Sequence, residues 1–352
     1  MKKSLRNYFI IMFLLVSLVH MQDFIHRLTV PLYFKTAVSL GYDSNFLRFS
    51  GEEMDNADFS AWMLGDAPSF DSFVIKPELR LTYSPVFHSG HDTNLKFRLA
   101  YSDYGQTKIK SYASMSAVLE QHLGTYQWLT LGYVISPDIF LRYYRDSDSL
   151  VRDTQKCRFT SETVYATYSF PVFRKTWIRL KSQLNKQYFV PEFTEFDMDI
   201  LSVESRIYTR MIPDTRLSFW VNIGAGDNIS FNNGLSSTTI DRAYSVTSTG
   251  FLGTYYPHNT LKAVHILLSA EYREYESLDL DDPLHLGRYH WDYKSSVWAD
   301  RDITRKLFGQ FRINYRFRQT DSQYDWVSSL KTFDKFEVWL KFSYDFTLDL
   351  FY

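Results

Sequence analysis

The stretch Phe336–Tyr352 reads FEVWLKFSYDFTLDLFY. Every even-numbered position in it is apolar or aromatic, whereas most odd-numbered positions carry Glu, Lys, Ser, Asp or Thr. Successive side chains of a β-strand point to opposite faces, so this pattern predicts a strand with one apolar face and one polar face. A strand in a soluble sheet commonly has about five or six residues, and one that crosses a bilayer has about 9–11. The alternation is therefore long enough for a strand that spans a membrane.

The same stretch resembles the terminal strand of bacterial outer-membrane β-barrels, in which an aromatic last residue follows alternating apolar residues. On this resemblance, the signal that the barrel-assembly machinery recognises consists of Tyr344, Phe346, Leu348, Leu350 and Tyr352. The resemblance also implies a location in the outer membrane, with its lipid, its lipopolysaccharide and the assembly machinery as partners. An edge strand of a soluble β protein is the alternative interpretation.

The beginning of the chain has the layout of a signal peptide. Lys2, Lys3 and Arg6 precede the apolar run Tyr8–Val19, which is too short to cross a bilayer as a helix. No clear small-residue cleavage pattern follows this run. We expect a signal peptide at residues 1–22 and a mature domain at residues 23–352, with an uncleaved anchor as the alternative.

Composition agrees with a membrane barrel. Aromatic residues make up 18% of the chain, yet the mean hydropathy is −0.28. No apolar run reaches the ~18 residues of a membrane helix, and a barrel hides its membrane signal because half of each strand faces water. The formal net charge of −1 gives no reason to expect nucleic acid as a partner. Without a Pro- or Ser-rich linker, the mature chain is expected to form one domain.

The alternation of apolar residues can be followed along the whole chain. Pro137 interrupts one segment without changing its phase, which predicts a long strand with a kink or bulge at the proline. The pattern predicts an all-β, antiparallel up-and-down barrel of about fourteen strands, with twelve or sixteen as alternatives. The predicted strands are Leu32–Phe46, Asp71–Pro85, Thr93–Tyr104, Ile109–His122, Tyr126–Arg145, Arg158–Phe170, Thr176–Tyr188, Phe196–Arg210, Arg216–Gly224, Ile240–Thr254, Leu261–Glu274, Arg288–Ala299, Arg305–Arg318 and Phe336–Tyr352.

The connections between these strands alternate in length. Short turns such as Leu123–Thr125 and Pro171–Lys175 follow the even-numbered strands, and long loops such as Leu47–Phe70 and Gln319–Lys335 follow most odd-numbered strands. Bacterial barrels have short periplasmic turns and longer extracellular loops. Both termini are therefore expected on the periplasmic side.

The polar faces of the predicted strands carry more Arg and Lys than acids. A basic ring in a water-filled pore favours anionic solutes, and a barrel of this size has room for a lumen. In the alternative interpretation the cations pair with acids across strands, for example Arg312 or Arg316 with Glu337 or Asp345. The pore-lining candidates are Arg80, Arg98, Arg142, Arg179, Lys181, Arg206, Arg210, Arg312, Arg316, Arg318, Glu337, Lys341 and Asp345.

The sequence favours a porin-like channel for passive or facilitated diffusion of small polar solutes, and the basic lumen extends this class to anionic ones. A non-conducting barrel, such as an adhesin, a scaffold or a secretion-system component, is the main alternative. A barrel-wall hydrolase is a third class, but the chain has no His-x-Ser pair of the kind that outer-membrane phospholipases use. Barrel proteases use clusters of Asp and His at the extracellular rim. His285, His290 and Asp292 near one predicted rim have the same residue types. We predict no enzyme, no catalytic residue and no cofactor, and the acidic loops lack calcium-loop spacing, so no metal site is predicted.

Overall fold

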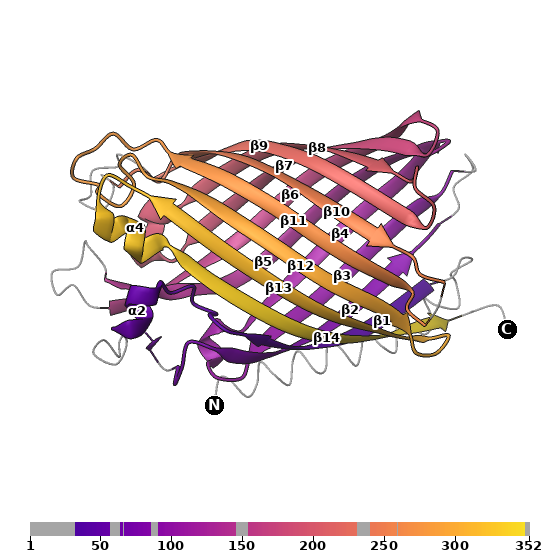
Figure 1. The fold of residues 1–352 in the computed structure, drawn as a ribbon, viewed down its shortest axis with the longest axis horizontal. Helices are drawn as coiled ribbons and strands as arrows, with labels where there is room; N and C mark the ends of the chain where they lie inside the picture. The colour runs from indigo at the N-terminus through magenta and orange to yellow at the C-terminus, as the bar shows by residue number, and fades with distance from the viewer. Residues whose placement is uncertain are drawn as a thin grey trace.

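The computed structural model describes residues 32–56, 64–65, 67–85, 91–145, 154–230, 240–258 and 260–348. Fourteen antiparallel strands form one closed barrel, in which sequence neighbours pair and β1 (Leu32–Asp43) closes the ring against β14 (Phe333–Leu348) (Figure 1). The predicted all-β up-and-down barrel of fourteen strands is confirmed. The predicted signal peptide at residues 1–22 lies outside the described residues.

The strand bounds agree with the predicted segments to within a few residues. Differences of four residues occur at β6, which starts earlier than predicted, at β9, which ends later, and at β10, which starts later. The remaining strands are β2 (Ser72–Tyr83), β3 (Thr93–Tyr104), β4 (Tyr112–Gly124), β5 (Gln127–Arg145), β6 (Thr154–Phe173), β7 (Thr176–Phe189), β8 (Met198–Thr209), β9 (Thr215–Asn228), β10 (Tyr244–Tyr255), β11 (Ala263–Tyr275), β12 (Tyr289–Asp302) and β13 (Leu307–Asp321).

The proline in β5 sits in a bulge, as the sequence predicted. The pairing of β5 with β6 shifts between Ser136 and Ile139 and again between Phe140 and Arg142. Asp138, next to the proline, has a positive φ of 56°. A bulge adds residues to one strand and re-aims the side chains beyond it. Beyond this bulge, Leu141 therefore packs against a loop cluster rather than continuing the lipid-facing row.

The two faces of the sheet differ in chemistry as the alternation requires. Apolar residues cover the outer face, and most of them are exposed, including Phe97, Leu131, Leu201, Ile223 and Phe311. The opposite face carries polar side chains that reach one another across neighbouring strands. The carboxylate of Glu78 on β2 lies 3.6 Å from Nζ of Lys341 on β14, across the small side chain of Ala37 on β1. The polar face is therefore the concave, lumen side of the barrel.

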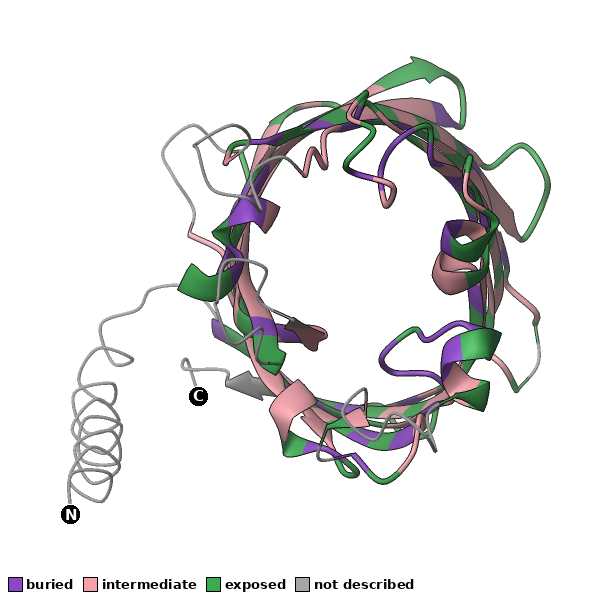
Figure 2. Cartoon of the chain, turned by 90° about the vertical axis from the view of Figure 1, so that its left-hand side faces the viewer, coloured by how far each residue is buried: buried purple, intermediate pink, exposed green. Residues whose placement is uncertain are grey.

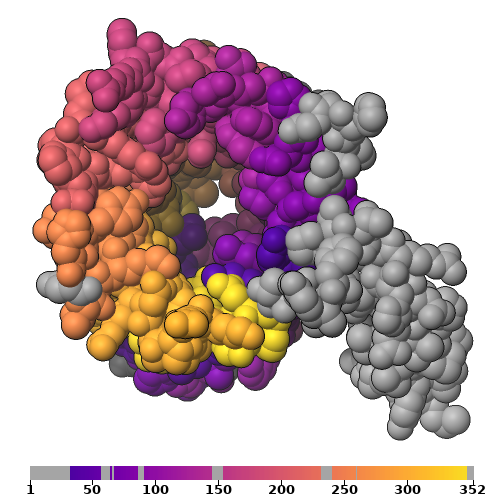
Figure 3. All heavy atoms as spheres, turned by 90° about the vertical axis from the view of Figure 1, so that its right-hand side faces the viewer, coloured from indigo at the N-terminus to yellow at the C-terminus, as the bar shows by residue number. Residues whose placement is uncertain are grey.

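The connections segregate by length to the two ends of the barrel. One end has the tight turns β4–β5 and β6–β7, and the other has the long loops and the short helices α2 (Gly51–Asp55), α4 (Asp325–Lys331), η1 (Lys108–Lys110) and η2 (Pro191–Phe196) (Figure 1). Seen from the long-loop end, these loops lie along the rim of the ring of strands (Figure 2). Seen from the short-turn end, the molecule is hollowed at its centre (Figure 3).

The loop between β1 and β2 packs onto the inner wall at the long-loop end. Its residues Phe46, Leu47 and Phe49 form a buried cluster with Phe140 of β5. The helix α2 is held by a capping box, in which the Ser50 and Glu53 side chains each accept a hydrogen bond from the other's backbone N–H. No helix in the described part of the chain is long and apolar enough to cross a membrane.

Candidate functional site

Cations on the inner wall formed by β6, β7, β8 and β9 lie against aromatic rings. The Lys181 ammonium is 4.9 Å from the Tyr165 ring centre, and the Arg206 guanidinium is 4.4 Å from that of Trp220. Arg179 lies 5.1 Å from Tyr208 and Arg210 lies 5.5 Å from Trp177, while the Trp177 and Tyr208 rings stack 5.1 Å apart at an interplanar angle of 4°. We call Trp177, Arg179, Arg206, Tyr208, Arg210 and Trp220 the stacked ladder.

Glycines on neighbouring strands make room for two of these rings. Gly250 on β10 is directly opposite Trp220, and Gly132 on β5 is directly opposite Tyr165. A Cβ atom at Gly250 would lie 2.0 Å from the Trp220 ring, and one at Gly132 would lie 2.1 Å from the Tyr165 ring. Each ring thus lies over the backbone of the next strand, where only glycine permits so close an approach. These two glycines therefore allow the Trp220 and Tyr165 rings to lie where Arg206 and Lys181 contact them.

Acids are scarce around the stacked ladder. Glu204 lies two residues before Arg206 on β8, and its two oxygens accept hydrogen bonds from the Nε and Nη2 atoms of Arg206 at 3.0 and 3.3 Å. Within the described residues, Arg179, Lys181 and Arg210 have no carboxylate within 4.0 Å. Ring faces rather than carboxylates therefore contact these three cations.

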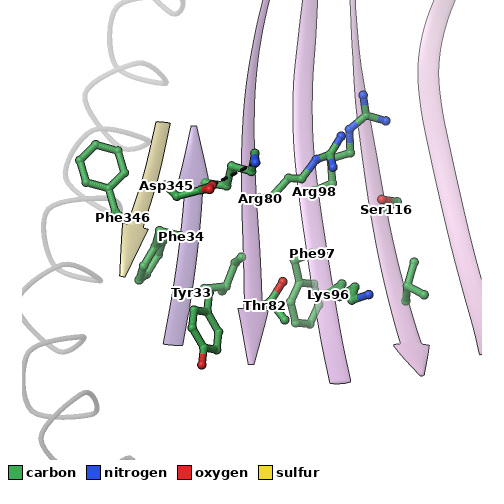
Figure 4. Close-up of a pocket in the computed structure, with 13 residues that line it drawn as sticks. Tyr33, Phe34, Arg80, Thr82, Lys96, Phe97, Arg98, Ser116, Asp345 and Phe346 are labelled. Carbon is green, nitrogen blue, oxygen red and sulfur yellow. Dashed lines mark ion pairs between the residues drawn. The ribbon is translucent and has the colours of Figure 1, made fainter. Parts of the chain in front are cut away.

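On the wall formed by β1, β2 and β3, carboxylates contact the cations. The Glu78 carboxylate lies 2.5 Å from Nε of Arg80 and accepts hydrogen bonds from Nε and Nη2 of Arg98 at 2.9 and 2.5 Å. Lys35 pairs with Asp345 at 3.1 Å. A cavity of about 520 Å³ adjoins these residues, and Figure 4 shows Arg80, Arg98 and Asp345 along it. Glu78 is only 8% exposed, so its charge is held close to both arginines.

A second buried acid organises β12 and β13. Asp292, 1% exposed, accepts hydrogen bonds from Nη2 of Arg316 at 2.5 Å and from Nη2 of Arg318 at 2.7 Å. Lys294 lies 3.9 Å from the same carboxylate. One buried carboxylate therefore contacts three cations. Glu78 on β2 likewise contacts three cations.

The pairings suggested for Arg312 and Arg316 are wrong. The register of β13 with β14 places Asn314, rather than an arginine, opposite Glu337. Glu337 consequently pairs with Lys335 at 2.7 Å, and Asp345 pairs with Lys35 on the other side of β14. Arg312 lies instead over the Trp298 ring, with its guanidinium carbon 4.1 Å from the ring centre. Cross-strand pairing of cations with acids does occur, but with other partners.

Arg142 holds the first loop rather than standing free in the lumen. Its Nη1 donates to Glu53 at 2.7 Å, and its Nη2 donates to the carbonyl oxygens of Leu47 and Arg48 at 3.1 and 3.0 Å. The Arg142–Glu53 pair is largely buried, with 15% and 6% of the two side chains exposed. Arg142 is therefore a structural clamp between β5 and the loop that follows β1.

Two lysines near this clamp have strongly lowered pKa values. Burial, together with the nearby guanidinium of Arg48, lowers the pKa of Lys110 in η1 to about 7. Burial likewise lowers the pKa of Lys331 in α4 to about 7, with Arg142 and Arg288 acting in the same direction. The charge at the long-loop end therefore changes near neutral pH.

The rim residues that could imitate a protease are engaged in other contacts. His285 lies 2.9 Å from Asp282, and burial lowers the pKa of its imidazole to about 4. His290 is 2% exposed. Asp292 is held by the two arginines described above. In the described part of the chain no three His, Cys, Asp or Glu side chains are placed to share a metal ion.

The structure places the other predicted lumen residues on the inner face. Arg80, Arg98, Arg179, Lys181, Arg206, Arg312, Arg316, Arg318, Glu337, Lys341 and Asp345 share the register positions of that face, and Arg210 follows β8 at the short-turn end. Inner-face cations that were not predicted, although strict alternation would have found them, include Lys35, Arg273, Lys294 and Lys335. Tyr344 and Phe346 face outward, whereas Leu350 and Tyr352 lie outside the described residues.

No protein-family model and no curated protein matches the chain. Solved structures that resemble it include the outer membrane channel DcaP of Acinetobacter baumannii, with 10% identity, a TM-score of 0.47 and coverage of 90% of this chain and 96% of that one. A loop-deletion mutant of OmpT from Vibrio cholerae has 9% identity, a TM-score of 0.45 and coverage of 90% and 98%. An anion-selective porin from Comamonas acidovorans has 8% identity, a TM-score of 0.41 and coverage of 90% and 98%.

These similarities are too distant to carry an argument about function, which rests on the chain's own geometry. The barrel has an even number of antiparallel strands, an apolar outer face, a polar inner face, short turns at one end and long loops at the other. Together these features define the outer-membrane type of β-barrel.

Proposed function

We propose that the protein is an outer-membrane channel for small polar solutes and that it prefers anions. The observation that supports this proposal is the charge of the β7–β8 wall. Arg179, Lys181 and Arg210 lie on or beside the inner face without a described acid in ion-pair contact. A cation ring that is not neutralised raises the local concentration of anions in a water-filled passage.

The proposal includes the location and the partners of the barrel. The exported chain inserts into the outer membrane, where lipid and lipopolysaccharide contact its apolar outer face. The barrel-assembly machinery recognises the alternating end of the chain, to which the outward-facing residues Tyr344 and Phe346 belong. Charged residues on the lipid face of a barrel cost about 2–4 kcal/mol at mid-membrane, which explains why the strands keep most of their cations on the inner face.

Single-channel recording of the refolded full-length protein in a planar bilayer tests the proposal. In a tenfold KCl gradient we expect stable open steps. The reversal potential should have the sign of the chloride equilibrium potential. Neutralising the three cations together, as R179Q/K181Q/R210Q, should move the reversal potential toward zero while the steps persist.

Lys186→Gln is the matched control for this experiment. Lys186 lies on β7 like Arg179, but its position alternates to the outer face, where it pairs with Asp199 at 3.3 Å. This variant should leave the reversal potential unchanged. A folded protein that passes no current would overturn the channel and favour the scaffold or adhesin alternative. Open steps with cation preference would overturn the proposed anion preference and leave the proposed channel in place.

A further inference from the structure

Two arginines face each other directly across the β7–β8 pair. Arg179 is the register partner of Arg206. Like charges directly opposite each other in a sheet are destabilising. An anion between the two arginines would reduce this repulsion. The barrel contains the same arrangement once more, because Arg80 on β2 is the register partner of Arg98 on β3.

The pair on β2 and β3 shows how the compensation is made. The carboxylate of Glu78 contacts both guanidiniums, at 2.5 Å from Nε of Arg80 and 2.5 Å from Nη2 of Arg98, and lies 3.6 Å from Lys341. One carboxylate therefore bridges two opposed arginines and a lysine. Hydrogen bonds between a charged guanidinium and a carboxylate are among the stronger hydrogen bonds in proteins.

On β8, Glu204 stands two residues before Arg206, as Glu78 stands two residues before Arg80 on β2, but no described acid contacts both Arg179 and Arg206. Both oxygens of Glu204 are bound to Arg206, on its own strand. The Nε atom of Arg179 reaches only the Ser169 hydroxyl, at 3.4 Å. Lys181, two residues along β7, is the register partner of Glu204 but contacts the Tyr165 ring rather than that carboxylate. Three cations thus share one acid.

The aromatic rings hold these guanidiniums in place. The Tyr208 ring centre lies 5.1 Å from Arg179 and 6.0 Å from Arg206. Trp177 stacks on Tyr208, and Trp220 lies 4.4 Å from Arg206 on its other neighbouring strand. A guanidinium that rests on a ring keeps edge N–H groups available in a fork that matches two oxygens, as in Arg179, whereas the Nε and Nη2 groups of Arg206 are bound to Glu204. Holding this fork in place in advance lowers the entropy lost on binding.

From these contacts we infer that Arg179, Lys181 and Arg206 form an oxyanion-binding site for the solute. A carboxylate or phosphate group of the solute takes the bridging position that Glu78 has between Arg80 and Arg98. Three cations and the single acid Glu204 leave two positive charges, which suits a phosphate or a dicarboxylate. This inference rests on the proposed channel, and it goes further by naming the chemical class that the channel binds.

Current block by added anions tests the inference. Chloride current through the full-length channel is recorded while phosphate, succinate or acetate is added, and the apparent Kd is taken from the concentration that halves the current. Phosphate and succinate are expected to block the wild-type channel. Arg179→Lys keeps the charge but loses the fork, so it should raise the apparent Kd about tenfold with an unchanged chloride preference.

Lys76→Gln is the matched control. Lys76 is also an inner-face cation resting on a ring, at 5.2 Å from Trp339, but it lies on the β2 wall. Its loss should lower the chloride preference slightly and leave the apparent Kd for oxyanions unchanged. If phosphate blocks more tightly than succinate, the natural group is a phosphate, and the reverse order identifies a carboxylate; both support the site.

Equal block of the wild-type and Arg179→Lys channels would overturn the inference, as would the absence of block by every oxyanion in a channel that prefers chloride. Neither result would affect the proposed channel. Conversely, a barrel that passes no current would overturn the proposed function. In that case phosphate binding to wild-type and Arg179→Lys protein in detergent, measured by calorimetry, tests the site by itself, and equal affinities would overturn it.

Discussion

The two sides of the lumen stabilise the same kind of residue in different ways. On the side of β12–β14 and β1–β3, acids hold most of the cations, as Asp292 holds Arg316 and Arg318. Arg312 and Lys76 on this side rest on rings instead. On the side of β6–β9, aromatic rings hold them, as Tyr208 holds Arg179. A carboxylate cancels the charge that it contacts, whereas a ring stabilises a cation and leaves its net charge in place.

Because of this difference, the acid-paired side contributes mainly to the stability of the barrel, and the ring-stacked side mainly to its ion selectivity. The acid-paired side connects strands through ion pairs that are costly to break, because removal of one partner leaves a buried charge alone. The ring-stacked side connects strands through contacts that are individually weaker, and its charge remains available to a solute. A count of lumen arginines alone cannot predict the field inside the barrel, because the two groups contribute unequally to it.

The largest expected effect is the loss of the buried acid on β12. Asp292→Asn keeps the shape of the side chain but leaves Arg316 and Arg318 without their shared carboxylate. We expect the free energy of unfolding to fall by about 3–5 kcal/mol. Urea unfolding of the folded protein in lipid vesicles, followed by tryptophan fluorescence, measures this change.

Asp345→Asn is the control for that measurement. Asp345 pairs with Lys35 on the same side of the lumen, but 53% of its side chain is exposed. Exposed ion pairs contribute about 0–1 kcal/mol, so this variant should stay close to wild type. Equal destabilisation by the two variants would contradict the distinction between buried and exposed pairs.

A second change would make the acid-paired side resemble the ring-stacked side. Glu78→Gln removes the carboxylate from Arg80, Arg98 and Lys341, and we expect a loss of about 2–3 kcal/mol from its charged hydrogen bonds. The same variant should increase the chloride preference, since three cations lose their counter-charge. The reversal potential in a KCl gradient reports this shift, and an unchanged value would show that these cations do not face the conducting path.

The sequence predicted the barrel and the inner-face positions because both depend only on the period of two in a strand. It did not predict the partners of the charged residues, since a pairing depends on the register between strands. Asn314, and not Arg312 or Arg316, lies opposite Glu337 for this reason. The contact of Arg142 with Glu53 joins residues 89 positions apart, through a loop whose path no periodicity encodes.

The stacked ladder also became visible only in the folded chain. Arg206 and Trp220 lie on different strands, and Gly250, which makes room for the ring, lies on a third. The predicted strand Ile240–Thr254, which contains Gly250, is rich in Ser, Thr and Gly, so its strand pattern is weaker than that of the other segments. The structure shows that the residue that weakens the strand pattern is the one that permits the close approach of Trp220.

A smaller effect is expected from filling this space. Gly250→Ala places a methyl group 2.0 Å from the present position of the Trp220 ring, so the ring must move away from β10 and disturb the contact with Arg206. The cost should be about 1–2 kcal/mol. Block by phosphate should weaken while the chloride preference stays, because no charge has changed. Gly253→Ala on the same strand is the control, since its nearest neighbour would be 3.1 Å away.

The smallest expected effect is a pH dependence at the long-loop end. The pKa of Lys110 and that of Lys331 are lowered to about 7 from an ordinary value of 10.5. Both side chains therefore become charged as the pH falls from 8 to 6, and the chloride preference should rise over that range. In the unfolded chain both lysines already bind protons below pH 10.5, so their contribution to stability is fully present above that pH and is lost as the pH falls toward 7.

The double variant K110M/K331M isolates these two lysines. Methionine keeps much of the buried apolar stem and cannot titrate, so the change in reversal potential between pH 8 and pH 6 should be smaller than in the wild-type channel. Any histidine that titrates in this range is present in both proteins and drops out of the difference. An identical pH response in the two channels would show that neither lysine acts on the permeating ions. The selectivity would then depend on the stacked ladder at the other end of the lumen.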